Sequence, residues 1–339
     1  MEQFNATNRS SLVFTIYENT TSVVAVDECV VIPFIQGTAL IVVNLLLALV
    51  GTFGNLLIIF AVLDTPQLHR RPSNFLLLSL AVADLMVTMC TQPLLVISLA
   101  FNTFAHRCIP EILLAYDISV NVLCSSSLAH LTVISIDRAI SIAKPHRHRS
   151  IMSKKRLKIT ICICWVISIA IASFRVPLPQ TALFSMAIFF VGYATFLCSY
   201  GVILYNVIQT RNNVYAGADA AMQSTARDRA VEKRVCEAVG IVTLIFSLCW
   251  LPVFIYLILV QGNTNDVVYS WIRTLYLSNS SINFIVYSWR IDHFRVAYVK
   301  MISKILQRCR CSNGIGSRNN TGVTDSRPAS GCRSSNSVH

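Results

Sequence analysis

Seven apolar runs, each long enough to cross a lipid bilayer, dominate this chain. A membrane-spanning helix needs about 20 mostly apolar residues, because the hydrocarbon layer is about 30 Å thick. The third, fifth and sixth runs are longer than this and are expected to continue into the cytosol. The pattern therefore predicts an all-α protein, a seven-transmembrane helix bundle with spans at residues 38–63, 74–99, 110–142, 157–176, 182–209, 232–260 and 269–288.

Polar sequence on either side of these runs divides the chain into four parts. Residues 1–36 are a predicted extracellular tail, and residues 37–290 are the seven-transmembrane domain. Residues 291–308 are predicted to form a short amphipathic eighth helix, and residues 309–339, rich in Ser, Asn, Gly and Arg, a disordered cytoplasmic tail. No signal-peptide pattern begins the chain, so the first span is expected to direct insertion.

The connections between the spans are short. The fourth and fifth spans are joined by about residues 176–181, and the fifth and sixth by about residues 210–231. No internal repeat is evident, which disfavours a transporter built from two related halves.

Composition and charge agree with a membrane protein and orient it. Charged residues make up 13% of the chain, against about 25% in soluble domains. Basic residues collect on the cytosolic side of membrane proteins. With the amino terminus outside, only four of the 28 Lys and Arg residues face the exterior: Arg9, Arg107, Arg175 and Arg273. We therefore predict a multi-pass plasma-membrane protein with an extracellular amino terminus.

Two further features fit this orientation. Three glycosylation sequons begin at Asn5, Asn8 and Asn19, in the tail that is predicted to be extracellular. The net charge of +12 is then explained by a cytosolic surface that faces membrane lipid. We expect no nucleic acid partner.

Most of the 12 cysteines lie in or beside spans, where they serve as small apolar packing residues. Only Cys29 and Cys108 are expected to face the oxidising exterior, so they are the one disulfide that we predict. Cys309 and Cys311 follow a basic amphipathic stretch and are predicted palmitoylation sites, the alternative being two free cytosolic thiols.

Polar residues within the spans predict a functional centre, because an ionisable group in a bilayer is costly and usually has a partner. Asp84 lies in the middle of the second span. Polar residues whose side chains carry oxygen atoms occur at similar membrane depths in the first, third and seventh spans: Asn55, Ser127, Asn279, Ser280 and Asn283. If they converge, they form either an oxygen-rich site for a small cation such as an allosteric sodium ion or a water-filled polar network.

At this point the motifs resemble those of rhodopsin-like, class A G protein-coupled receptors over about residues 36–300. Their order and spacing together make the resemblance specific. The motifs are Gly54-Asn55, Leu80 through Asp84, Asp137-Arg138, Trp165, Tyr200 with Ile203, Phe246, Cys249-Trp250-Leu251-Pro252, Asn279-Ser280, Asn283 through Tyr287, and Phe294-Arg295. The resemblance implies a receptor that passes the binding of an extracellular ligand to a heterotrimeric G protein.

The resemblance also assigns roles in activation. Arg138 would pair with Asp137 and with Glu232 in the inactive state. Pro252 would kink the sixth helix, so that a shift beside Trp250 becomes a swing at its inner end. The remaining members of the activation set are Phe246, Asn283, and Tyr200 with Tyr287, which would turn toward Arg138 in the open form. Without the surrounding motifs, these aromatic residues would be read as ordinary core.

The chain departs from the family pattern at several positions that bear on coupling. The usual seventh-span proline is Phe284, the fifth-span proline is Gly192, and the tyrosine after Asp-Arg is Ala139. The family's third-span cysteine position is Leu113 and the second extracellular loop has no cysteine, which leaves Cys108 to pair with Cys29.

The ligand class is constrained by the same comparison. Val120 stands where amine receptors carry an aspartate, so a simple monoamine is not expected, and the seventh span has no lysine for covalent retinal. Asp117 and Arg273 either bind a zwitterionic or peptide ligand or pair with each other. The rest of the predicted lining is mostly apolar and suits a lipid or hydrophobic small molecule: Asn121, Cys124, Phe184, Val253, Phe254 and Leu257.

The short second extracellular loop, its missing cysteine and Asp117 resemble the melanocortin, cannabinoid and adenosine group of receptors, melanocortin most of all. A transporter or channel is the alternative function, in which the buried charges would form an ion pathway. No metalloprotease or serine hydrolase motif is present, so we expect no catalytic residues.

Overall fold

The computed structural model describes residues 32–69, 72–143, 145–175, 182–214, 223–259, 266–290, 294–300 and 302–303. The chain divides into two compact units, residues 1–295 and residues 296–339. In the second unit the described residues, 296–300 and 302–303, are helical and lie within the predicted eighth helix.

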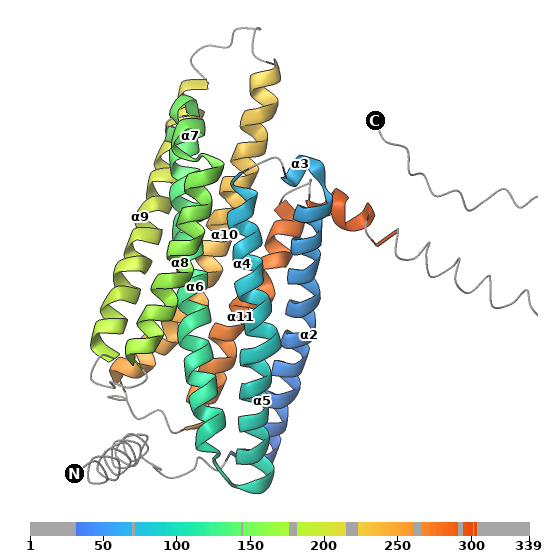
Figure 1. The fold of residues 1–339 in the computed structure, drawn as a ribbon, viewed down its shortest axis with the longest axis vertical. Coiled ribbons are helices and arrows are strands. Elements are labelled where there is room, and N and C mark those ends of the chain that lie inside the picture. The colour runs from blue at the N-terminus through green and yellow to red at the C-terminus, as the bar shows by residue number, and fades with distance from the viewer. Residues whose placement is uncertain are drawn as a thin grey trace, which may run out of the picture. The chain divides into compact units, whose positions relative to one another are not determined.

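The first unit is a bundle of long helices (Figure 1). Its elements are α2 (Phe34–Asp64), α3 (Pro66–His69), α4 (Asn74–Met86), η1 (Val87–Thr91), α5 (Gln92–Ala100), η2 (Phe101–Ala105), α6 (Pro110–Ala143), α7 (Pro145–Ile151), α8 (Lys154–Arg175), α9 (Ala182–Val214), α10 (Gln223–Leu259) and α11 (Val267–Arg290). The prediction of an all-α bundle is confirmed.

Among the described residues, six helical segments are long and apolar enough to cross a membrane by length and composition. The seventh span, α11, falls outside that set because its buried face carries many hydroxyl and amide side chains. One boundary prediction was wrong. Helix α9 runs on to Val214 and α10 begins at Gln223, so the connection predicted at 210–231 is largely helical. Hydropathy marks only the part of a helix inside the bilayer, and helix-forming polar residues extend both helices beyond it.

The second span is not a uniform α-helix. Its α-helical parts, α4 and α5, are separated by the π-helical turn η1, and η2 ends the span. Pro93 lies at the start of α5 and has no N–H to donate to a carbonyl one turn earlier. Such an interruption widens the helix locally. The widened turn begins three residues after Asp84, at the centre of the bundle.

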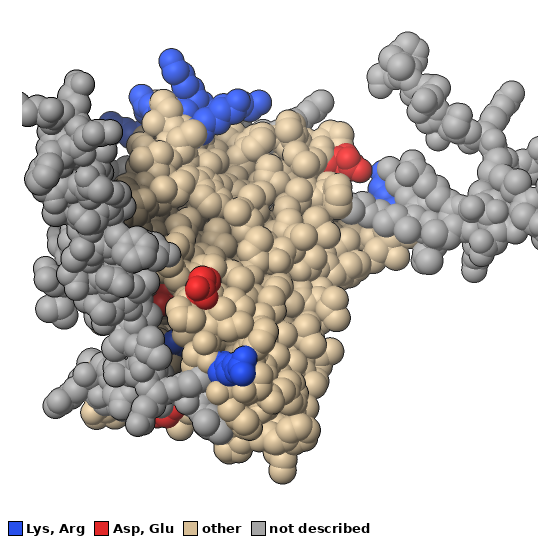
Figure 2. Space-filling view, turned by 60° about the horizontal axis from the view of Figure 1, so that its bottom comes forward, with Lys and Arg blue, Asp and Glu red and all other residues tan. Residues whose placement is uncertain are grey.

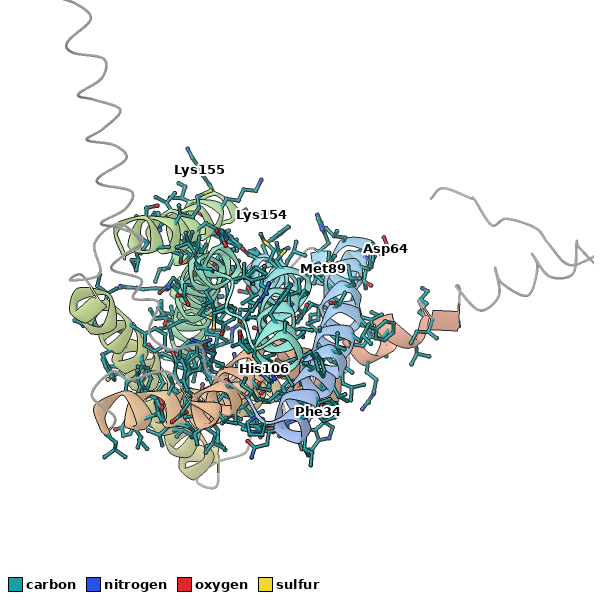
Figure 3. The ribbon with its side chains drawn as sticks, turned by 90° about the horizontal axis from the view of Figure 1, so that it is seen from below. Phe34, Asp64, Met89, His106, Lys154 and Lys155 are labelled. Carbon is teal, nitrogen blue, oxygen red and sulfur yellow. The ribbon has the colours of Figure 1, made fainter. Side chains whose placement is uncertain are left out.

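The outer surface of the bundle suits a lipid environment. Exposed apolar side chains run along several helices, including Phe53 on α2, Val166 on α8 and Leu248 on α10. Figure 2 shows this mostly uncharged surface, with Lys and Arg gathered mainly at one end of the view. Lys154 and Lys155 extend outward from the start of α8 (Figure 3). An apolar belt with a basic end is the distribution that the predicted membrane topology requires.

The α2–α11 contact accommodates the residue that replaces the family proline. The ring of Phe284 lies against the backbone of Gly54, where a Cβ atom would overlap the ring. At Gly51, one turn earlier, a Cβ would come 2.5 Å from Thr88 and 2.6 Å from Ser281. The two helices therefore approach closely because both positions lack a side chain.

We predict that Gly54→Ala lowers the melting temperature of the purified protein, because overpacking of this kind costs about 1–3 kcal/mol. Thermal unfolding followed by intrinsic fluorescence measures the change. Phe284→Ala in the Gly54→Ala background removes the obstructing ring and should recover part of the loss. A melting temperature that Gly54→Ala leaves unchanged would contradict the close packing of α2 and α11.

Candidate functional site

A buried carboxylate at the centre of the bundle joins three helices. Asp84 on α4 is fully buried. The hydroxyl of Ser127 on α6 donates to its Oδ1 at 3.2 Å, and Nδ2 of Asn283 on α11 donates to its Oδ2 at 2.7 Å. Both oxygens of the carboxylate are thus engaged, and the helices are far apart in sequence. Of the polar residues predicted to converge here, Ser127 and Asn283 contact the carboxylate directly.

Two buried amide oxygens, on α2 and α11, have no hydrogen-bond partner within the described residues. Asn55 donates from Nδ2 to the carbonyl oxygens of Gly51 and Ser280, at 3.0 Å each. Its own Oδ1 and the Oδ1 of buried Asn279 accept no hydrogen bond within the described residues. A carboxylate together with unsatisfied buried amide oxygens on the neighbouring helices matches the donor set of a hard monovalent cation. No group of three or more His, Cys, Asp or Glu residues occurs among the described positions, so neutral oxygens would supply most ligands.

Near the end of α6, the side chain of Arg138 is bound by that of its neighbour Asp137. Its Nε donates to Oδ2 of buried Asp137 at 2.9 Å, and Nη2 contacts the same oxygen. His148 on α7 contacts the other carboxylate oxygen, Oδ1, through Nε2 at 2.8 Å. The side chain of Glu232, the third predicted member, lies outside the described residues. The sequence argument did not identify His148, although its place in a basic run after Pro145 is a signal for it.

The structure shows the packing contacts of the two tyrosines that are predicted to take part in activation. Tyr200 packs with Ala139 and Ile203, and its hydroxyl presses against Gly240 of α10. The ring of buried Tyr287 lies 6.5 Å from that of Phe294.

Aromatic rings surround Trp250 on α10. Its ring stacks on Phe246 with centroids 5.6 Å apart and on Tyr276 of α11 at 5.1 Å, and Phe189 of α9 lies at 4.8 Å. Pro252 follows within the helix. Phe189 and Tyr276 were not predicted, because nothing in their local sequence shows that they face Trp250. A shift of Trp250 would therefore change ring contacts on α9, α10 and α11 together.

Most of the predicted ligand lining belongs to one apolar cluster. Cys124 and Val253 are buried in it, and Val120, Phe254 and Leu257 pack against it. The amide of Asn121 instead donates to the carbonyl of Asp117 on its own helix, at 2.7 Å. The side chain of Phe184 lies outside the described residues.

The predicted pairing of Asp117 with Arg273 is not found among the described ion pairs. Asp117 is exposed, whereas the Arg273 guanidinium lies over the rings of Tyr116 and Tyr269.

The predicted modification sites fall mainly outside the described part of the chain. Cys108 is disulfide-bonded, and its partner is not among the free cysteines of the described residues. The following predicted sites lie outside the described residues: Cys29, Asn5, Asn8, Asn19, Cys309 and Cys311. Pairing of Cys29 with Cys108, glycosylation and palmitoylation all stay predictions.

Comparison with known proteins identifies the family. The model of the 7 transmembrane receptor (rhodopsin family) matches residues 54–287, the region that contains Asp84, Arg138 and Trp250. The chain belongs to this family. It is 26% identical to the human Probable G-protein coupled receptor 45, over 79% of this chain and 83% of that one. It is also 26% identical to the dog Adenosine receptor A2a (79% and 73% covered) and 27% identical to the chicken Adenosine receptor A2b (79% and 89% covered).

The chain is therefore a rhodopsin-like G protein-coupled receptor and a multi-pass plasma-membrane protein. The adenosine receptors among its relatives belong to one of the three groups that its sequence resembles. The transporter or channel reading, kept open by the buried charges, is not supported by any of these findings.

An ion pair that the sequence argument did not identify joins α10 to α11 in this receptor. Arg290, the last residue of α11, contacts a carboxylate oxygen of Glu237. The two side chains are about one-third exposed, with relative accessibilities of 31% and 37%. Along α10, Glu237 lies between the polar start of the helix and Gly240, which the hydroxyl of Tyr200 contacts. The pair is therefore placed to restrain α10 against outward movement.

We predict that Glu237→Gln raises basal G protein activation by up to about fivefold, because a partly exposed ion pair contributes about 0.2–1 kcal/mol. A cell-based activation assay at matched surface expression measures the effect. The reversed pair, Glu237→Arg with Arg290→Glu, should return the basal level toward that of the native chain. If Glu237→Gln leaves basal activity unchanged, the pair does not restrain α10.

Proposed function

We propose that this receptor is held inactive by contacts around Asp84, Arg138 and Glu237, and that an extracellular ligand releases α10 to open a binding site for a heterotrimeric G protein. In this proposal the amino terminus is extracellular and the basic end of the bundle faces the cytosol. The observation that carries the proposal is the hydrogen-bonded ion pair of Arg138 with Asp137. While Arg138 is bound in this way, it is not available to contact a G protein.

Asp137 is itself shared between two basic groups. With His148 of α7 on one carboxylate oxygen and Arg138 on the other, it ties the third span to the short helix that follows it. Charge-assisted hydrogen bonds of this kind are stronger than neutral ones. Release of Arg138 therefore requires a competing gain, which the proposed movement of α10 and the incoming G protein would supply together.

The aromatic cluster would carry the ligand signal. Val253 lies in the apolar cluster, and Phe254 and Leu257 pack against it, on the part of α10 that continues toward the predicted extracellular end. Trp250 lies one turn further in. A ligand that displaces Trp250 would disturb its stacking on Tyr276 and Phe246. Because Pro252 leaves α10 with a missing backbone hydrogen bond, a small rotation there would produce a larger displacement at its cytosolic end.

The central polar site would favour the inactive form by binding sodium. Asp84, Ser127 and the oxygen atoms of Asn279 and Asn55 supply a carboxylate with neutral oxygen ligands, and Ser280 and Asn283 border it. A cation there would neutralise the carboxylate and tie α4, α6 and α11 together, so that sodium and an activating ligand oppose each other.

The test of coupling is basal G protein activation in cells, measured across a panel of G protein subtypes. The native chain should give a signal with at least one subtype, and Arg138→Ala should lose it at matched surface expression. Lys155→Ala, an exposed residue of α8 with no described contact, is the matched control and should keep the signal. Equal signals from the native chain and Arg138→Ala, or none from the native chain with any subtype, would contradict the proposal.

The sodium site has a separate prediction. When choline replaces sodium, activation by the native receptor should increase, whereas Asp84→Asn should respond equally in both salts because it lacks the carboxylate charge. Asp64→Asn, an exposed carboxylate at the end of α2, is the control and should keep the native response. If Asp84→Asn keeps the full sodium response, Asp84 does not bind sodium, and the water-filled polar network is the remaining interpretation of the site.

A further inference from the structure

One cationic side chain in the bundle lies against aromatic rings and forms no ion pair among the described residues. The guanidinium of Arg273 on α11 lies 4.5 Å from the ring centre of Tyr269 and 5.3 Å from that of Tyr116 on α6. Its Nε is closed off from solvent and donates no hydrogen bond within the described residues. The ion pairs of the described chain do not include it.

This arrangement leaves donor capacity unused. A guanidinium carries five N–H groups in a planar fork that matches a carboxylate or a phosphate. Aromatic faces attract the charge but accept none of these N–H groups as a carboxylate would. A buried N–H donor without an acceptor is unfavourable, so the site gains most from an anion brought by another molecule. Asp117, next to Tyr116, is exposed; its charge acts on Arg273, but the two form no ion pair among the described residues.

The surroundings of Arg273 define the rest of the ligand. The hydroxyls of Tyr116 and Tyr276 are hydrogen-bonded to each other at 2.7 Å, and both rings belong to the apolar cluster of the bundle. Tyr269 and Ile272, the neighbours of Arg273 along α11, pack against the same cluster. An acidic group on Arg273 would therefore have apolar surface beside it. This combination suits an amphipathic anion rather than a small hydrophilic one.

We propose that Arg273 binds the carboxylate or phosphate group of an amphipathic ligand of this receptor. The inference rests on the proposed function for its consequence, since Tyr276 connects the site to Trp250 through a stacked pair of rings 5.1 Å apart. An anion that draws the guanidinium away from Tyr116 changes the environment of the Tyr116–Tyr276 hydrogen bond. The position of Tyr276 against Trp250 then changes with it.

The test measures thermal unfolding of the full chain in nanodiscs of zwitterionic lipid, so that the membrane supplies no competing anion. The probes are octanoate and octyl phosphate, with octanamide as the neutral counterpart. At least one acid should raise the melting temperature of the native chain, whereas octanamide should not. In Arg273→Gln the apparent dissociation constant for that acid should rise by about tenfold or more, the effect of losing a charged hydrogen bond. Arg273→Lys keeps the charge and should retain part of the shift.

The two acids distinguish the source of the anion, because a response to octanoate alone indicates a carboxylate ligand and one to octyl phosphate alone a phosphate ligand. The proposal is overturned if neither acid stabilises the native chain, or if Arg273→Gln is stabilised equally. A purely structural role of Arg273 between the tyrosines predicts one of those results.

Melting does not depend on a G protein, so Arg138→Ala should keep the acid-dependent shift. A shift without any signalling would therefore count against coupling and leave the anion site standing.

Discussion

The buried carboxylate of Asp84 is the constraint on which the rest of the bundle depends. A charged group at the centre of an apolar bundle must be satisfied by its neighbours, and here Ser127 and Asn283 come from helices far apart in sequence. That requirement brings α4, α6 and α11 together at one depth. The close approach of α2 to α11 at Gly51 and Gly54 then places Asn55 beside the same centre. Polar satisfaction and helix packing thus select one arrangement of the spans.

The contacts around this centre explain how the ends of the receptor are connected. On one side, Tyr276 of α11 stacks on Trp250 of α10, and Trp250 stacks on Phe246 one turn further along the helix. On the other, Tyr200 presses against Gly240 of α10 while Glu237 contacts Arg290. Helix α10 is therefore held along much of its length by rings and by one ion pair. Each contact is individually modest, so none of them alone would prevent the movement of α10 that we propose.

Much of the fold follows from the sequence because lipid imposes a strong rule: each span needs enough apolar residues to cross the bilayer and must satisfy its backbone internally. The spans and the convergence around Asp84 were predictable for that reason. The contacts of His148, Glu237 and Tyr276 were not, since each depends on which face of a helix meets a distant partner. The sequence predicted that the fifth and sixth helices continue into the cytosol, but not that they reach Val214 and Gln223, because hydropathy does not report on polar helix. The fit of Phe284 against Gly54 shows how a departure from a family motif is matched by a neighbour that sequence spacing does not reveal.

The central claim is that α10 moves away from α6 when a G protein binds. The most direct measurement is the distance between genetically encoded spin labels at Ala143 on α6 and Arg234 on α10, both of which are exposed. In purified receptor, addition of a nucleotide-free G protein should shift the distance distribution to longer values. Asp84→Asn and Glu237→Gln should each increase the long-distance fraction before any G protein is added. A distribution that is the same in the presence and absence of G protein, in a preparation that forms the complex, would contradict the account.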